Sequence, residues 1–83
     1  MTSFTALIKG YELDRILFKV KKNEEFRRKF IEDFDSACEG FSLSPDERQA
    51  LRNREYARLY DLGAKDELIL VLARLSRDAK KKT

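Results

Sequence analysis

The sequence predicts an all-α fold, a compact bundle of four or five short helices. Apolar residues recur three and four positions apart along most of the 83 residues, which is the spacing of helices with one buried face. Asparagine, serine and aspartate precede these segments and glycines follow them, as helix caps do. The apolar run 68–73 could also form a strand, but the sequence has no second strand-like run to pair with it.

Length and composition favour a single domain covering residues 1–83. Charged residues make up 40% of the chain and hydrophobic residues 42%, a balance typical of a folded domain rather than a disordered one. A domain of this size buries only roughly 60–65% of its unfolded surface, so nearly every large apolar side chain is needed in the core. Residues 79–83, with three lysines, are expected to form a basic, frayed tail.

No segment has the features of a membrane span or a secretory leader. The run 68–73 is far shorter than the ~20 residues that cross a bilayer, and residues 1–4 lack the basic start of a signal peptide. The single cysteine, Cys38, cannot form an internal disulfide, which suits a reducing compartment. We therefore expect a cytoplasmic protein with no membrane partner.

Two helices are predicted in the first half of the chain. The first covers residues 4–22, or only the part after Gly10, because glycine costs about 1 kcal/mol relative to alanine inside a helix. Asn23 is a suitable N-cap for the second helix, which ends at Gly40 as a left-handed residue. Cys38 and an aromatic ridge on this helix are expected to pack in the core; the ridge consists of Phe26, Phe30 and Phe34.

Shorter helices are predicted in the second half. The range Ser44–Glu47 has the pattern of a capping box with proline at the first helical position, and this helix should run to about Arg52. Asn53 can cap the next helix, which ends at Gly63, or one kinked helix can run across it. Asp66 is expected to cap the last helix.

Histidine is absent, which excludes several kinds of chemistry. The chain has no His–Ser or His–Cys nucleophile pair, no imidazole base and no histidine-containing metal site. Its carboxylates and its one thiol do not have the spacing of metal ligands. We therefore assign no catalytic, cofactor-binding or metal-binding residue to this chain.

The charges are separated along the sequence. Of 18 basic and 15 acidic residues, seven basic residues lie within 15–29, whereas 32–47 holds six acids and no base. Proteins that bind nucleic acids usually carry a basic stripe that nearby acids do not compensate. This arrangement disfavours a nucleic-acid partner.

Two consecutive motifs resemble a known family. The stretch 40–51, Gly-Phe-Ser-Leu-Ser-Pro-Asp-Glu-Arg-Gln-Ala-Leu, is similar to the G-L-T-x-x-E-x-x-A-L stretch in the small (alpha) subunit of LigAB-type extradiol aromatic-ring-opening dioxygenases, the family of protocatechuate 4,5-dioxygenase. The stretch 54–64, Arg-Glu-Tyr-Ala-Arg-Leu-Tyr-Asp-Leu-Gly-Ala, resembles that family's R-D-W/Y-x-x-L-x-x-L-G stretch. The family often has a His-Pro turn after the Leu-Gly pair, where this chain has Lys65 and Asp66.

The resemblance implies a division of labour between two chains. In this family the large (beta) subunit holds the Fe(II) and the catalytic base, and the small subunit packs over the active-site cleft. Such iron is held by two histidines and a carboxylate, which a chain without histidine cannot supply. A cover over the cleft excludes water from the reaction. The resemblance thus implies a non-catalytic subunit of a hetero-oligomer, with Fe(II) on the large catalytic dioxygenase subunit and no cofactor on this chain.

Candidate partner-binding residues lie in the predicted helix 54–62 and the turn after it. Tyrosine and arginine are enriched at interface hot spots, and Arg54, Arg58 and Asp61 fall on one helical face. The alternative is a solvated face with an ion pair between Arg58 and Asp61. The candidates are Arg54, Tyr56, Arg58, Tyr60, Asp61 and Lys65.

Two other functions stay open. The chain could be a stand-alone protein-interaction or recognition module that has the same fold and no dioxygenase role. It could also bind nucleic acid weakly through a helix-turn-helix-like pair at 45–52 and 54–62. The contacts with phosphates or bases would then come from Arg48, Arg52, Arg54 and Arg58.

Overall fold

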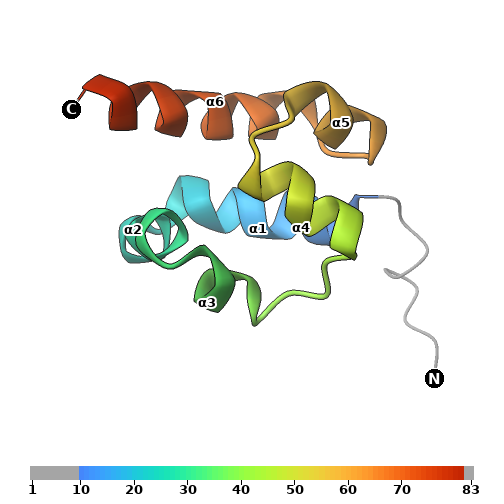
Figure 1. Cartoon of the computed structure of the whole chain (residues 1–83), viewed down its shortest axis with the longest axis horizontal. Coiled ribbons are helices and arrows are strands. Elements are labelled where there is room, and N and C mark those ends of the chain that lie inside the picture. Colours follow the sequence, from blue (N-terminus) through green and yellow to red (C-terminus); the bar gives the residue numbers. More distant parts are fainter. Residues whose placement is uncertain (1–9, 82–83) are drawn as a thin grey trace.

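A computed structural model describes residues 10–81, with side chains through Leu75, and all the regular structure in this range is helical. Figure 1 shows α1 near the middle of the molecule and the long α6 running above it. α1 packs against α2 and α6, and α5 packs against both α4 and α6. The all-α prediction is confirmed, with six helices in the described part rather than four or five. They are α1 (Tyr11–Lys22), α2 (Glu24–Glu32), α3 (Phe34–Cys38), α4 (Pro45–Arg52), α5 (Tyr56–Asp61) and α6 (Asp66–Lys81).

α1 forms the centre of the hydrophobic core. It begins directly after Gly10, whose φ of 77° is left-handed. Of the two predicted ranges for this helix, the structure therefore has the shorter one, which begins after Gly10. Its buried residues follow the helical spacing and have no exposed surface; they are Leu13, Ile16, Leu17 and Val20. The apolar positions predicted further upstream, Phe4, Leu7 and Ile8, lie outside the described residues.

The predicted phenylalanine-rich helix is two helices, because the chain breaks at Asp33. Asn23 caps α2 as expected, its side-chain oxygen accepting a hydrogen bond from the Phe26 amide at 2.9 Å. At Asp33 the backbone leaves the helical region, and the carboxylate accepts from the Ser36 amide to start α3. A short acidic side chain competes for backbone amides in this way, which the apolar spacing alone does not reveal.

The aromatic ridge packs in the core, as predicted. Phe30 is only 1% exposed, and its ring lies 6.5 Å from that of Phe26 and 5.2 Å from that of Phe34, centroid to centroid. Cys38 is also buried, and this burial raises the pKa of its thiol. A buried thiol with a raised pKa is a poor nucleophile, which agrees with a packing role for Cys38.

The predictions for the two helix-ending glycines had different outcomes. Gly63 ends α5 in a left-handed conformation with φ 107°. The amides that follow close a Schellman motif, Gly63 donating to the Tyr60 carbonyl and Ala64 to the Leu59 carbonyl. The prediction of a left-handed Gly40 is wrong: after α3 the chain turns through a hydrogen bond from the Phe41 amide to the carbonyl of Cys38, without a positive φ at Gly40.

The capping box at the start of α4 is present. The Glu47 amide donates to Ser44 Oγ at 3.1 Å, and the Ser44 amide donates to Glu47 Oε1 at 2.9 Å. α4 ends at Arg52, so Asn53 caps its C-terminus and not the next helix, and the alternative of one kinked helix is wrong. The physical reason is Arg54, whose left-handed φ of 57° closes a Schellman motif in the place that glycine usually takes.

α6 begins one residue earlier than the predicted cap implies. Asp66 is its first helical residue, because the carbonyl of Lys65 already accepts the amides of Leu68 and Ile69. The Lys65 amide is held by Asp14 Oδ1 of α1 at 3.0 Å, which fixes the turn before the helix. Of the predicted basic tail, residues 79–81 belong to α6 and residues 82–83 lie outside the described range.

An exposed ion-pair cluster joins α3 to α4. Asp35 Oδ1 accepts a hydrogen bond from Arg48 at 3.0 Å and a second one from Arg52. The hydrogen bond from Arg48, together with the charges of both guanidinium groups, lowers the pKa of Asp35 below its ordinary 3.8. The folded state therefore favours the ionised carboxylate.

This pKa shift predicts how Asp35 contributes to stability. Because the folded-state pKa is lowered, the contribution is present above the ordinary pKa and is lost as the pH falls through the folded-state value. Asp35→Asn should therefore lower the urea midpoint at pH 7, and its difference from wild type should shrink below pH 3.8. Glu39→Gln, at an exposed site nearby, is the control and should leave the midpoint unchanged. A difference for Asp35→Asn that stays constant down to pH 2 would contradict this account.

Candidate partner-binding surface

The structure does not place Arg54 on one helical face with Arg58 and Asp61, as the spacing predicted. Its left-handed backbone puts it in the turn between α4 and α5 rather than on a helix. The guanidinium lies 5.4 Å from the centroid of the Phe30 ring and donates to the carbonyl of Leu51 at 2.9 Å. Partial burial lowers the pKa of the Arg54 guanidinium. Arg54 therefore belongs to the packing around the aromatic ridge.

Arg58 also serves the fold. In place of the pair with Asp61, which was the alternative to a partner-binding face, Arg58 forms ion pairs with Asp46 at 2.9 Å and with Glu55 at 3.3 Å. The first of these ties the start of α4 to α5. Asp61 and the side chain of Lys65 are exposed.

Tyr56 and Tyr60 do share a surface. They line a shallow groove of about 440 Å³ between α5 and α6. Tyr60 is 59% exposed, and Leu70 on the opposite wall is 56% exposed. Apart from Asp66, the other lining residues are apolar: Ala57, Ile69 and Ala73. This α5–α6 groove has the amphipathic tyrosines and exposed aliphatic surface that are typical of protein interfaces.

Sequence reasoning missed the α6 wall of the groove. The core face of α6 uses Leu68, Leu72 and Leu75 at helical spacing. The six consecutive apolar residues 68–73 are more than one face of a helix can bury, so Leu70 must point outward if this run is helical. That surplus apolar residue was the signal in the sequence.

The four arginines proposed for nucleic-acid contacts are all engaged within the protein. Arg48 and Arg52 hold Asp35, and Arg54 covers the Phe30 ring. Arg58 holds Asp46 and Glu55. Contacts with phosphates would have to compete with these interactions, which weakens the helix-turn-helix alternative.

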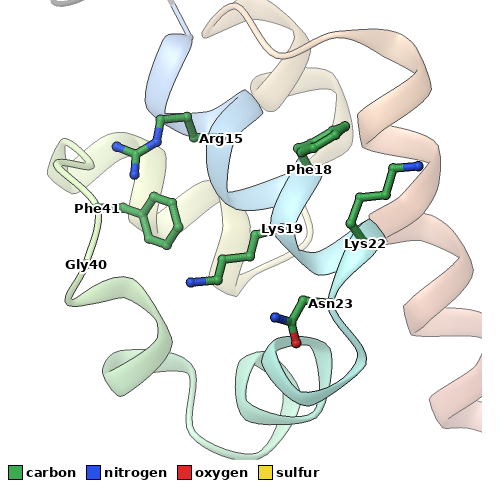
Figure 2. A pocket seen from close by; sticks show the side chains of 7 residues that line it. All are labelled: Arg15, Phe18, Lys19, Lys22, Asn23, Gly40 and Phe41. Carbon is green, nitrogen blue, oxygen red and sulfur yellow. The ribbon is translucent and has the colours of Figure 1, made fainter.

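A second hollow lies between α1 and the turn after α3, and its lining includes three basic side chains. It has a volume of about 520 Å³, and Figure 2 shows the ring of Phe41 between the ends of Arg15 and Lys19. We call it the α1 basic pocket; its lining residues are Arg15, Phe18, Lys19, Lys22, Asn23, Gly40 and Phe41. No carboxylate belongs to this lining, although Arg15 forms an ion pair at 2.9 Å with Glu12, three positions earlier on α1.

Metal-binding clusters and membrane-spanning helices are both absent from the described residues. Among them, no three carboxylate, thiol or imidazole side chains gather as metal ligands would. No helix within the described range is both long and apolar enough to cross a bilayer.

Comparison with known proteins identifies one family. Residues 13–81, from α1 to the end of α6, match the family described as aromatic-ring-opening dioxygenase LigAB, LigA subunit. The match thus extends upstream of the motifs noted above and includes the core helix α1. Neither the curated proteins nor the solved structures yielded a match. Because the family match covers most of the chain, the protein belongs to the LigA-subunit family of LigAB aromatic-ring-opening dioxygenases.

Proposed function

We propose that this chain is a non-catalytic small subunit that binds a separate extradiol dioxygenase large subunit and covers its active site during the breakdown of aromatic compounds. Membership in the LigA-subunit family supports a partner of this kind. The observation that carries the proposal is the α5–α6 groove, whose exposed apolar residues have no covering element within the described part of the chain. A contiguous apolar surface of this kind favours a protein partner.

The construction of the groove suits a rigid cover. α6 packs along α1, and the Asp14 carboxylate of α1 holds the turn that leads into α6. The ion pair between Arg58 and Asp46 fixes α5 against α4. A surface built on packed helices loses little conformational entropy on binding, which favours affinity.

The side chains of this chain do not fit an extradiol iron. The sequence contains no histidine, and no group of potential ligands gathers among the described residues. An open site of two histidines and a carboxylate therefore requires another polypeptide. In this proposal the Fe(II) belongs to the large subunit, and this chain supplies shape and excludes water.

The test uses Leu70→Glu, which places a charge in the groove. Because desolvating an unpaired carboxylate is unfavourable, binding to the large subunit from the same source should weaken by roughly 30-fold or more, the range of an interface hot spot. Isothermal titration calorimetry measures the affinity. A ring-cleavage assay of the Fe(II)-loaded complex measures the covering function, and its rate should fall at subunit concentrations that saturate wild type.

The matched control is Ile31→Glu. Ile31 is 49% exposed on α2, close to the 56% of Leu70, and it does not line the groove. Equal losses for both variants would show that the groove is not the binding surface. If the wild-type chain neither binds the large subunit nor alters its ring-cleavage rate, the dioxygenase role is refuted and the stand-alone interaction module is the remaining reading.

A further inference from the structure

The α1 basic pocket is a second candidate binding surface, and α1 and the turn after α3 both contribute side chains to it. The cations come from α1, whose residues 15, 19 and 22 are three and four positions apart and therefore lie on one face. The opposite wall is the turn after α3, with the ring of Phe41. Residues far apart in sequence thus form one hollow that combines positive charge with aromatic surface.

The turn that carries Phe41 is anchored to the same face of α1. Glu12 accepts hydrogen bonds from the Ser42 amide at 2.9 Å and from Arg15 at 2.9 Å. One carboxylate therefore holds the turn and orients the guanidinium, which lies 4.9 Å from the centroid of Phe41. The pocket wall is preorganised, so little reordering opposes the binding of a ligand.

The two lysines keep their charges available. Lys19 Nζ lies 4.9 Å from the ring centroid of Phe26, and Lys22 Nζ lies 5.8 Å from that of Phe18. Neither lysine makes an ion pair with a residue in the range 10–75. Phe18 itself is 52% exposed. A carboxylate could therefore reach the ammonium groups while an apolar side chain packs on the ring.

We propose that the α1 basic pocket docks an acidic segment of the large subunit, one that presents carboxylates beside an aliphatic or aromatic side chain. This inference rests on the proposed function and names the chemistry of a second contact with the same partner. Charge complementarity favours an acidic occupant, since the lining contains no acid and its Lys19 and Lys22 have no ion-pair partner among residues 10–75. Such contacts steer the encounter of two subunits and set their register.

A protein segment fits the pocket better than a nucleic acid does. Phosphate backbones are bound by a continuous basic stripe. Here the cations gather at one hollow, and Glu24 and Glu25 follow directly after the lining residue Asn23. These carboxylates would repel a phosphate chain that extends along α2, whereas a short acidic segment can end at the pocket.

The experiment reverses the charge of the pocket in Lys19→Glu/Lys22→Glu. The matched control is Lys21→Glu/Lys29→Glu, at exposed sites outside the lining. Each pair changes the net charge from +3 by −4, so both variants carry −1. Binding to the large subunit is measured by calorimetry at low and high salt. We expect the pocket variant to bind at least tenfold more weakly at low salt, with a shallower dependence on salt, and the control to stay within twofold of wild type.

Each outcome is decisive. Equal losses in both variants would indicate general charge attraction and overturn the inference, and unchanged binding in the pocket variant would overturn it while leaving the proposed function intact. If the wild-type chain does not bind the large subunit at all, the proposed function and this partner are both refuted.

In that case, titration with a capped peptide of glutamate and leucine, followed by NMR, decides the chemistry of the pocket. Shifts at the amides of Lys19, Lys22 and Phe41 that the pocket variant lacks would support an acidic ligand. Tighter binding of an oligothymidine than of the peptide would refute it.

Discussion

Gly10→Ala should destabilise the protein by about 3 kcal/mol or more. The left-handed φ of 77° costs an L-residue about 1–2 kcal/mol. A Cβ at this position would also lie 2.4 Å from the carbonyl carbon and oxygen of Gly63, where backbone meets backbone and no side chain can move aside. Relieving this overlap requires the start of α1 to separate from the end of α5. Urea denaturation followed by circular dichroism measures the loss.

Gly40→Ala is the matched control for this substitution. Gly40 has no positive φ, and a Cβ there would meet nothing within 4 Å. Replacing glycine where the backbone is compatible reduces the entropy of the unfolded chain, so this variant should be unchanged or more stable by about 0.4–1 kcal/mol. A loss for Gly10→Ala no larger than that for Gly40→Ala would disprove the close approach of Gly10 and Gly63.

Phe30→Ala should destabilise the fold by about 3–5 kcal/mol, the range for removing a large buried aromatic side chain. Phe30 is 1% exposed and lies between two other rings of the ridge, so the cavity cannot collapse easily. The substitution also removes the ring beneath the Arg54 guanidinium. A domain of this length has a total stability of about 4–12 kcal/mol. The variant should therefore lose at least about a quarter of the stability of the protein, measured as a lower urea midpoint by circular dichroism.

Two further variants keep this prediction measurable. Phe30→Leu leaves a smaller cavity and should lose less, so that its unfolding can be followed if the alanine variant does not fold. Ile31→Ala changes the neighbouring residue on α2, which is 49% exposed, and should stay within about 0.5 kcal/mol of wild type. Similar losses at positions 30 and 31 would contradict the assignment of Phe30 to the core.

The two proposed binding surfaces both include large apolar side chains that the core does not bury. The buried faces of α1 and α6 meet in the core, while Leu70 on α6 and Phe18 on α1 remain exposed. Exposed apolar residues on packed helices are costly for solubility, which is a physical reason to connect them with binding. One of these surfaces is apolar, and the other is cationic.

Features that depend on neighbouring residues were predictable from the sequence. The burial of α1, the Asn23 cap and the capping box at Ser44 all involve residues at most seven positions apart. Their geometry follows from the helix itself, whatever packs around it. The same is true of the two motifs that resemble the LigA subunit, because they consist of helix starts, helix ends and the spacing between them.

Predictions failed where a polar residue changes the backbone locally. Asp33 breaks the phenylalanine-rich helix, and Arg54 adopts the left-handed conformation that glycine takes at Gly63. The turn at Arg54 is supported by a contact that the local pattern does not contain, the packing of the guanidinium on Phe30, whereas Asp33 acts locally through the Ser36 amide. Because Arg54 lies in the turn before α5, it does not share a helical face with Arg58 and Asp61, as had been predicted.

Short-range spacing was enough to predict the helical class, most helix ends, the aromatic core and the family of this protein. Which charges are neutralised and which surfaces remain open depends on how the helices pack against one another. The Arg58–Asp46 ion pair, the hydrogen bond from the Lys65 amide to Asp14, and the contact of Phe41 with Arg15 of α1 join residues 12 or more positions apart. Such contacts depend on how whole helices pack, and this packing leaves the α5–α6 groove and the α1 basic pocket exposed.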